Sequence, residues 1–375
     1  MRGYFDHNAT SPIRPEIVAV MAEVMAGEAG NPSSMHAEGR LARELLDQAR
    51  SRLAGLLDCE PGQVLFTSGA TESNNLAIRG MFAADPGLRV ITCAAEHVSV
   101  LGTVEALGSE GADTVMLAVD GSARPNLEEL TRLGAKGPAL MALGWANSES
   151  GHLADIDGLL AAKGPGCRLH LDAAQAVGRV PVAMREGMDS LALSAHKFGG
   201  PRGIGALVLA DHSAVEGLMS GGPQEAGLRP GTENLAGIVG MGLAAKLAGK
   251  QLGDEQERLG RLRETLWDRL TDALDGLIRV SAKDGLPGTL TVALPDVRAE
   301  VLVAALDMEG FAVSTGSACA AASPEPSHVM EALGLPLSHR NGVIRISMGW
   351  NTSAEQTEGL AEAFVHISQR ARRAA

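Results

Sequence analysis

The sequence predicts an α/β protein with a large domain, in which helices cover a mostly parallel seven-stranded sheet, and a smaller α+β domain. Two observations support this prediction. Short apolar runs recur through the first part of the chain and are separated by helix-length stretches, which is typical of repeated βα units. The runs lie near Val64, Val90, Thr114, Leu140, Leu169, Leu191 and Ala206. After Gly240, leucines recur at helical spacing over a long region that leads into the smaller domain.

Two amphipathic helices are expected before the first strand, because apolar residues recur there at helical spacing. The first runs from Pro15 to Gly27, with Ile17, Val20, Met21, Val24 and Met25 on one face. The second is marked by Leu41, Leu45, Ala49, Leu53 and Leu56. The long helical region carries Leu259, Leu262, Leu266, Leu270 and Leu274. We expect the large domain to span 13–245, and the small domain to combine 1–12 with 246–375.

Composition agrees with a soluble enzyme and excludes several other classes. The 375 residues suffice for about two domains. No apolar run approaches the roughly 18 residues that a membrane helix needs, and the N-terminus has no signal pattern, so we expect a cytoplasmic protein. The net charge of −13 argues against nucleic-acid binding and leaves basic protein partners possible. The four cysteines form no CxxC pair, so neither a metal site nor a disulfide framework is expected.

A lysine follows one of the buried strands. The apolar run Leu191–Leu193 leads into Ser194, Ala195, His196 and Lys197. Open α/β sheets bind ligands at this end of their strands. A lysine that is partly desolvated and close to other cations loses proton affinity, so it can form a Schiff base with an aldehyde such as pyridoxal phosphate.

Two further strand ends carry polar groups that suit the same cofactor. Asp172 ends the run RLHLD, and a carboxylate there keeps a pyridine nitrogen protonated. The stretch SGATESNN, which begins at Ser68, follows another strand and opens a helix, whose N-terminus attracts a phosphate. Each site alone is also explained as a polar turn, a helix N-cap or a capping box. Their occurrence together, in the order phosphate site, acid, lysine, favours a cofactor site.

These motifs resemble those of the class V aminotransferase superfamily of fold-type-I pyridoxal-phosphate enzymes, and specifically the cysteine desulfurases of the NifS/IscS type. The resemblance covers nearly the whole chain. Its markers are DHNATSP, GNPSS, SGATESNN, AEH, LDAAQAVG, SAHKFGGPRGIGAL, LRPGTEN and TGSAC.

The resemblance implies the functional residues. Lys197, His97 and Cys319 would be catalytic. The cofactor-binding set would be Ala70, Thr71, Asp172, Gln175, Ser194, His196, Lys197 and Thr232, with Thr232 coming from the second subunit of a homodimer. Within it, Gln175 would contact the phenolic oxygen, and His97 would stack over the ring. The substrate-binding set would be Asn31, Asn147, Ser148 and Arg345, with Arg345 as the carboxylate clamp.

The cysteine at 319 separates a desulfurase from its relatives. It lies in a stretch of small residues, from Gly316 to Pro324, which is typical of a flexible loop. A thiol on such a loop can reach the substrate sulfur and then a partner, although a lone cysteine is more often buried and inert. The loop resembles that of the long-loop, NifS/IscS-like group.

The sequence departs from the family pattern in several places. Ser148 stands where the family usually has an asparagine, so catalytic strength is in question. Ala226 and Trp350 stand where an arginine is commoner. The chain stops at Ala375, directly after its last predicted helix, whereas relatives often carry a longer tail used in docking to a scaffold.

The resemblance therefore predicts an enzyme that converts L-cysteine to L-alanine and leaves a persulfide on Cys319. The sulfur would go to an acceptor protein for iron–sulfur cluster assembly, for other thio-cofactors or for tRNA thiolation. Two alternatives remain open at this point. One is a related transaminase or selenocysteine lyase in which Cys319 is incidental, and the other is a scaffold of low activity, which Ser148 makes conceivable.

Overall fold

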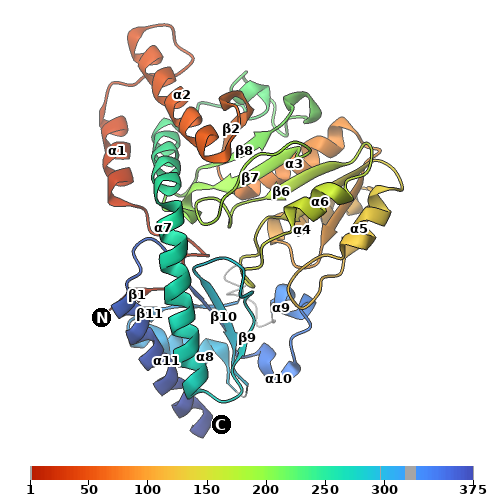
Figure 1. The fold of residues 1–375 in the computed structure, drawn as a ribbon. Helices are drawn as coiled ribbons and strands as arrows, with labels where there is room; N and C mark the ends of the chain where they lie inside the picture. Colours follow the sequence, from red (N-terminus) through yellow and green to blue (C-terminus); the bar gives the residue numbers. More distant parts are fainter. Residues whose placement is uncertain (1, 296, 317–326, 375) are drawn as a thin grey trace.

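The computed structural model describes residues 2–295, 297–316 and 327–374, and it has a large α/β part and a smaller part joined by one long helix (Figure 1). The large part is built on a seven-stranded sheet with the order β2-β8-β7-β6-β5-β3-β4. Its strands are β2 (Val64–Thr67), β3 (Arg89–Cys93), β4 (Thr114–Leu117), β5 (Ala139–Gly144), β6 (Arg168–Asp172), β7 (Ser190–Ser194) and β8 (Gly205–Leu209). Only β8 runs antiparallel to its neighbours. The prediction of a mostly parallel sheet is confirmed, and each apolar run of the sequence forms one strand.

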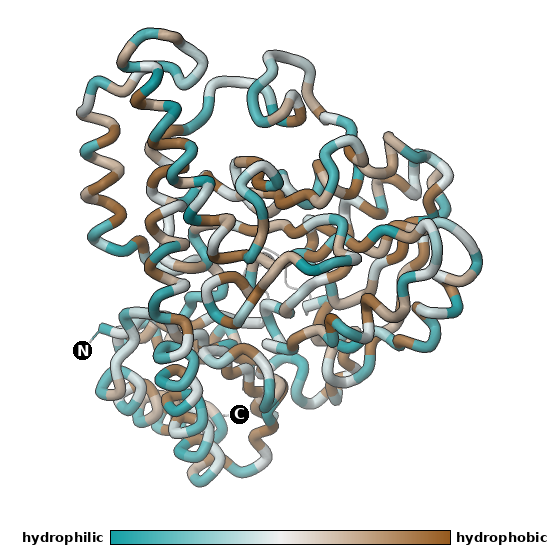
Figure 2. Tube along the Cα trace, turned by 45° about the horizontal axis from the view of Figure 1, so that its top comes forward, coloured by the Kyte–Doolittle hydropathy of each residue, from teal (hydrophilic) through white to brown (hydrophobic). Residues whose placement is uncertain are grey.

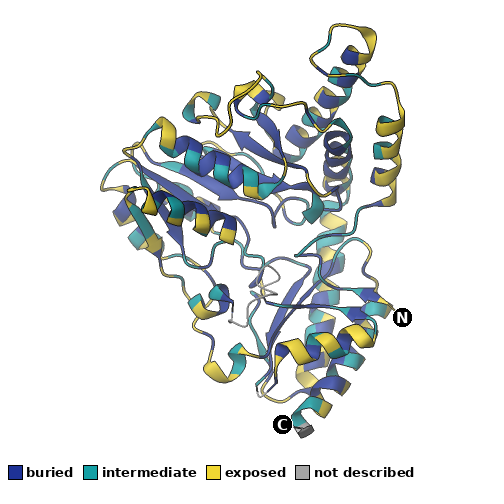
Figure 3. Cartoon of the chain, turned by 180° about the vertical axis from the view of Figure 1, so that it is seen from behind, coloured by how far each residue is buried: buried dark blue, intermediate teal, exposed yellow. Residues whose placement is uncertain are grey.

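Helices bury both faces of this sheet. Alternate residues of each strand point to opposite sides, so each strand contributes to two cores. On one face Leu65 and Leu140 pack with α3 (Ala70–Ala84) and α4 (Val98–Ser109). On the other face Phe66 and Met141 pack with α2 (Ala37–Leu57), α5 (Leu127–Gly134) and α6 (Ile156–Ala162). Apart from the edge strand β4, the strands are accordingly buried along most of their length (Figure 3).

The first helix, α1 (Pro15–Ala26), lies at the edge of this part and is mostly hydrophobic, with Glu16 and Glu23 as its charged residues (Figure 2). Of its predicted apolar face, only Ile17 is fully buried. Met25 is 75% exposed, so the chain covers that face incompletely.

The long helix α7 (Leu235–Ala273) connects the two parts. It begins before Gly240, because the Asn234 side chain caps it by accepting a hydrogen bond from the Gly237 N–H. Its first half contributes Ile238 to the core under the large sheet, and its second half contributes Leu266 to a second core. The predicted domain boundary at 245/246 thus falls inside one continuous helix, and this division stays a prediction.

The smaller part contains a four-stranded antiparallel sheet with the order β12-β13-β10-β9. Its elements are β9 (Ile278–Arg279), β10 (Thr289–Ala293), β12 (Ser314–Thr315), β13 (Val343–Ser347), α8 (Ala299–Met308), α9 (His328–Ala332), α10 (Leu337–Arg340) and α11 (Ala354–Ala374). The N-terminal strand β1 (Gly3–Tyr4) pairs in parallel with β11 (Phe311–Ala312). Both termini therefore lie on the smaller part (Figure 1), and the segment after β1 runs from it towards the large sheet.

Among the described residues, no helix is long and apolar enough to cross a membrane.

Candidate active site

The carboxyl ends of the parallel strands open into a cavity of about 610 Å³ between the large and small parts. Most of the residues predicted for the site line it, namely Ala70, Thr71, His97, Asn147, Ser148, Asp172, Gln175, Ser194, His196, Lys197 and Arg345. Asn31 and Thr232 are exposed and do not line the cavity of their own chain. Cys319 lies outside the described residues. The sequence motifs thus converge on one place, although they are far apart in the chain.

The N-terminus of α3 forms one end of the cavity. The turn before it is held by a 2.8 Å hydrogen bond between Thr67 Oγ1 and Ser73 Oγ. A Cβ on Gly205 would lie 2.5 Å from Gly69 Cα, so glycine is needed there for β8 to pack against this turn. The first backbone N–H groups of α3 have no acceptor within the helix, and the helix dipole favours an anion beside them. This end of the cavity is suited to a phosphate.

His196 stands beside the phosphate end as a neutral group. Burial, together with the nearby positive charges of Lys197 and Arg202, lowers the pKa of His196 from 6.5 to about 4. Its Nδ1 lies 3.1 Å from Thr10 Oγ1. At neutral pH it can offer a hydrogen bond to a phosphate oxygen without an added charge.

Asp172 lies at the end of β6 and is 8% exposed. Its Oδ2 accepts a 2.7 Å hydrogen bond from Asn74 Nδ2, and its Oδ1 accepts one of 2.9 Å from the Ala174 N–H. Hydrogen bonds to a carboxylate stabilise its negative charge. The group can therefore serve as the partner of a protonated ring nitrogen.

Lys197 lies at the end of the short helical turn Ala195–Lys197, which follows β7, and its amine enters the same cavity. Nζ donates to the backbone carbonyls of Asn8, at 2.6 Å, and Ala9, at 3.0 Å. Both carbonyls belong to the N-terminal segment, which crosses from the smaller part. Two backbone acceptors of this segment therefore hold the amine in place.

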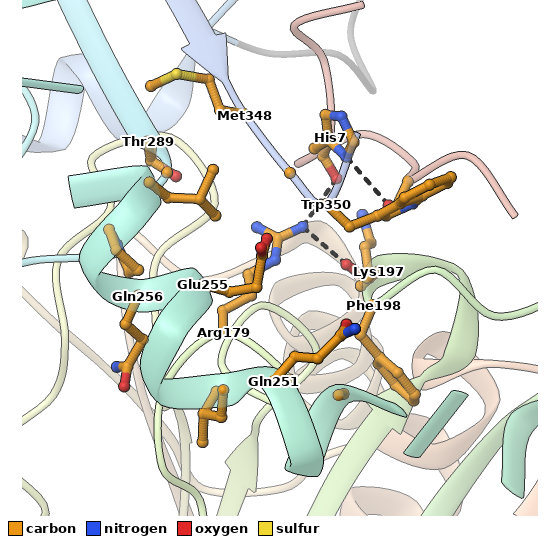
Figure 4. A pocket seen from close by; sticks show the side chains of 18 of the residues that line it. His7, Arg179, Lys197, Phe198, Gln251, Glu255, Gln256, Thr289, Met348 and Trp350 are labelled. Atoms are coloured by element: carbon orange, nitrogen blue, oxygen red, sulfur yellow. Dashed lines mark hydrogen bonds between the residues drawn. The ribbon is translucent and has the colours of Figure 1, made fainter. Parts of the chain in front are cut away.

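Arg179 lies beside Lys197, and both line a second, much smaller cavity against α7 (Figure 4). Its guanidinium donates to the carbonyls of His7, at 2.8 Å, and Lys197, at 3.1 Å. It also donates to Gln175 Oε1 at 2.8 Å and to Asn8 Oδ1 at 2.5 Å. Burial lowers the pKa of Arg179 to about 10, and the charge of Arg345 acts in the same direction. Because Arg179 occupies the oxygen of the Gln175 amide, that amide presents its N–H to the site, where Nε2 donates to the Asn8 carbonyl at 2.9 Å.

His97 is the N-cap residue of α4 and lines the opposite wall. Its Nδ1 accepts a 3.1 Å hydrogen bond from the Ser99 N–H and lies 2.8 Å from Ser99 Oγ. Next to it, burial raises the pKa of the Glu96 carboxyl to about 7, although the Cys93 thiol donates to Glu96 at 3.0 Å and opposes this shift. The wall thus carries an oriented imidazole beside a carboxyl that titrates near neutral pH.

Arg345 enters the cavity from β13 and is 2% exposed. Its Nη2 pairs with Asp6 Oδ1 at 2.8 Å, and its Nη1 donates to the carbonyls of Gly316, at 3.2 Å, and Ser148, at 3.4 Å. Its Nε is buried and has no hydrogen-bond partner among the residues that the structure describes. A buried guanidinium with a donor still to be satisfied suits a carboxylate ligand.

Two neighbouring predicted residues differ in what their side chains do. Asn147 uses its whole amide to hold a turn, since Nδ2 donates to the Ala95 carbonyl and Oδ1 accepts from the N–H groups of Glu149 and Ser150. The Ser148 side chain is half-buried and makes no hydrogen bond to any described residue. Its carbonyl instead accepts from Asn8 Nδ2 at 2.8 Å. The backbone at 148 is therefore fixed, while its hydroxyl is available to a ligand.

The two described residues that border 317–326 meet near Glu149. Ser327 Oγ lies 2.6 Å from Glu149 Oε2, and a Cβ on Gly316 would lie 2.9 Å from the same oxygen. Burial raises the pKa of this carboxyl, and the charge of Arg345 opposes the shift. The described residues on either side of the cysteine-bearing segment thus both lie close to a carboxylate that lines the cavity.

The other two departures from the expected pattern lie outside this cavity. Ala226 is exposed and adopts a left-handed conformation with φ of 57°. Trp350 donates its indole N–H to the Pro12 carbonyl at 3.0 Å, and the Arg14 guanidinium lies 5.1 Å from its ring centre (Figure 4). The indole therefore ties the N-terminal segment to the smaller part.

Neither a local motif nor hydrophobic periodicity in the sequence predicts several residues of the site. Asn8, Arg179, Asn74 and His170 were not predicted, although Asn74 lies in SGATESNN and His170 in RLHLD. Each acts through contacts across the fold, which neither periodicity nor a local motif encodes. A polar residue inside an otherwise apolar strand, as at His170, is the one signal that could have identified a buried network.

A comparison with known protein families shows to which family this chain belongs. Residues 3–360 match the family described as aminotransferase class-V. This chain belongs to that family. The family uses pyridoxal phosphate, and the cavity fits this group, because it combines a helix N-terminus, a lysine amine and a carboxylate with hydrogen bonds to both oxygens.

Individual relatives agree with this assignment. A protein of Cereibacter sphaeroides named cysteine desulfurase is 41% identical, and the alignment covers 94% of this chain and 92% of that protein. A solved structure described as a NifS-like protein has a TM-score of 0.92 at 30% identity, covering 99% of this chain and all of the other. Another, described as SspA in complex with cysteine, has a TM-score of 0.81 at 30% identity and covers 92% and 98% of the two chains.

Proposed function

We propose that this class V enzyme is a cysteine desulfurase, which converts L-cysteine to L-alanine and leaves the sulfur as a persulfide on Cys319. One observation carries the proposal: the buried Arg345, with a donor still unsatisfied, faces the same cavity as the Lys197 amine and Asp172. The relative named cysteine desulfurase and the solved structure that contains cysteine support the substrate.

The residues of the cavity divide the work as follows. Bound pyridoxal phosphate supplies an electron sink for the substrate α-carbon. Asp172 would hold the proton on the ring nitrogen, Gln175 would donate its N–H to the phenolic oxygen, and the α3 N-terminus with Thr71, Ser194 and His196 would hold the phosphate. The Lys197 amine would carry the cofactor and, when free, would take the α proton of the substrate.

The substrate is held and cleaved from the side of the smaller part. Arg345 binds its carboxylate through the Nε edge, and Ser148 lies next to that carboxylate. The thiolate of Cys319 attacks the substrate sulfur, and the C–S bond breaks as the S–S bond forms. The proton count then balances, because one thiol and one cysteine give one persulfide and one alanine. His97 is placed to assist proton transfer on the opposite face.

We further propose that the chain works as a homodimer in the cytoplasm and passes its sulfur to an acceptor protein, for iron–sulfur cluster assembly or another thiolation pathway. Thr232 is exposed and lies outside its own cavity, which fits a role at the phosphate of the partner subunit. The net charge of −13 favours an acceptor with a basic surface.

Product analysis of three variants with L-cysteine tests the activity. The wild type should release alanine and no keto acid, and it should carry a persulfide. Lys197→Ala should lose the visible band of the bound cofactor and all turnover. Cys319→Ser should bind cysteine and change that band, yet form neither alanine nor persulfide.

The matched control for the cysteine is Cys59→Ser. Cys59 lies outside the cavity, and burial with the neighbouring carboxylates Glu60 and Asp58 raises the pKa of its thiol to about 11. It should behave as the wild type. Normal alanine release by Cys319→Ser would instead assign the chain to a lyase, such as a selenocysteine lyase, and keto acid would indicate a transaminase.

A further inference from the structure

A buried hydrogen-bond network joins the two walls of the active-site cavity. At its centre lies Asn74, on α3, which is completely buried. Its Nδ2 donates to Asp172 Oδ2 at 2.7 Å and to Ser99 Oγ at 2.8 Å, and its Oδ1 lies 2.9 Å from His170 Nε2. Both hydrogens and the oxygen of this amide are therefore used, by Ser99 on α4 and by Asp172 and His170 on β6.

The charge of Asp172 fixes every proton in this network. An ionised carboxylate only accepts hydrogen bonds, so Asn74 must turn its NH₂ group towards Asp172 and its oxygen towards His170. His170 then has to donate from Nε2, and its Nδ1 accepts from Ser190 Oγ at 2.8 Å. Burial lowers the pKa of His170 to about 4, in agreement with a neutral ring.

The same reasoning extends to His97 on the other wall. Ser99 Oγ accepts from Asn74, so its own hydrogen is left to donate to His97 Nδ1, 2.8 Å away. The Ser99 N–H donates to the same nitrogen at 3.1 Å. Because Nδ1 accepts from both groups, the proton of the neutral His97 ring is on Nε2.

We propose that Asn74 is a positioning residue that links the ring-nitrogen partner Asp172 to His97, and that it both stabilises the Asp172 charge and sets the His97 tautomer with its proton on Nε2. His170 and Ser190 hold the Asn74 amide in this orientation. The consequence for catalysis rests on the proposed function: the His97 ring offers a hydrogen bond from its Nε2–H, while its Nδ1 is occupied by the Ser99 hydroxyl and N–H. The assignment to Asp172 and the cofactor does not depend on the substrate.

The two arms of the network predict different defects. Asn74→Leu keeps the volume and removes both arms, so the Asp172 charge loses one of its hydrogen bonds. Loss of a hydrogen bond to a charged group weakens binding by about tenfold to a hundredfold. Ser99→Ala removes only the hydroxyl that links Asn74 to His97, and it keeps the backbone cap of α4 and the bond from Asn74 to Asp172.

The experiment uses holoenzyme reconstituted with pyridoxal phosphate that is labelled with nitrogen-15 in its ring. For Asn74→Leu we expect the ring-nitrogen NMR signal to move from the protonated towards the neutral form, and the cofactor dissociation constant to rise about tenfold. For Ser99→Ala we expect an unchanged ring-nitrogen signal, with kcat for cysteine about tenfold lower and KM within about twofold, since Arg345 is untouched.

Asn75→Ala is the matched control, because Asn75 is the next residue of α3 and its side chain bonds only to the Thr71 carbonyl of its own helix. It should retain the wild-type signal and dissociation constant. A wild-type ring-nitrogen signal in Asn74→Leu would overturn the proposal. So would a ring-nitrogen shift in Ser99→Ala equal to that in Asn74→Leu. If Asn74→Leu fails to fold, Ser99→Ala still tests the His97 arm, and a wild-type kcat in this variant would refute it.

Failure of the proposed function has a separate signature. In that case the wild type would yield no alanine from cysteine, while the ring-nitrogen signal and the cofactor dissociation constant would still report on Asn74 and Asp172.

Discussion

Replacement of Ser148 by asparagine should raise the catalytic efficiency of this enzyme. The backbone at 148 is held by Asn8, whose Nδ2 donates to the Ser148 carbonyl at 2.8 Å, and by Arg345 at 3.4 Å. The side chain therefore projects from a fixed point beside the predicted carboxylate clamp. Its hydroxyl has no partner among the described residues and is shorter than an amide, so it reaches a bound substrate less directly.

The size of the effect follows from one hydrogen bond. A bond to a charged group contributes roughly 1.5–3 kcal/mol, which corresponds to about tenfold to a hundredfold in rate. A bridging water retains part of this contribution, so the lower end applies. We expect Ser148→Asn to raise kcat/KM for L-cysteine by about tenfold.

Steady-state alanine production by wild type, Ser148→Asn and Ser109→Asn is the assay. Ser109 is exposed at the end of α4, where its hydroxyl bonds to the Glu105 carbonyl, so the same substitution there should leave the kinetics unchanged. An unchanged or lower kcat/KM in Ser148→Asn would show that the pocket is built around serine, and the reasoning would fail.

Three further predictions concern stability. Burial raises the pKa of Glu96 from 4.5 to about 7, so the stability that this group contributes at low pH is lost as the pH rises through 7. Between pH 5 and pH 8, the free energy of unfolding of Glu96→Gln should therefore increase by roughly 1–3 kcal/mol relative to that of the wild type, as measured by thermal unfolding. For His170, burial lowers the pKa from 6.5 to about 4, so stability should fall as pH drops from 6.5 towards 4, by roughly 3 kcal/mol from this group; a flat acid limb in denaturant titrations would contradict it. Arg179→Met should lose about 2–3 kcal/mol, because four oxygens would lose their donor; equal denaturation midpoints for variant and wild type would disprove that role.

The seven strands and the strand-end motifs could be predicted because they are local. A buried parallel strand needs a continuous apolar run, and a residue that ends such a run is placed at the ligand edge of the sheet by topology alone. Lys197 and Asp172 were found in this way, and the structure places them in one cavity with Arg345 from the smaller part.

Other features depend on contacts that a sequence pattern does not encode. The start of α7 at Leu235 is decided by the Asn234 side chain rather than by the leucine repeat. The position of Trp350, under the Arg14 guanidinium, requires two segments to meet that are distant in the chain. Hydrophobic patterning also does not reveal Asn74, because its role depends on three partners on two other elements, α4 and β6.

The N-terminal segment shows most clearly how the fold completes the site. Asp6 pairs with the buried Arg345, and the Asn8 carbonyl accepts from both Lys197 Nζ and Gln175 Nε2. The Asn8 amide is oriented in turn by Arg179, at 2.5 Å from its Oδ1. These three donors, which are predicted to bind cofactor or substrate, are therefore already held at defined positions by a short segment that β1 anchors to the smaller part. Because unpaired buried donors are costly, these contacts preserve the geometry of the cavity before a ligand satisfies the same groups. The motif DHNA thus acts on the site through backbone carbonyls, the Asp6 carboxylate and the Asn8 amide, which hold other residues of the site in position.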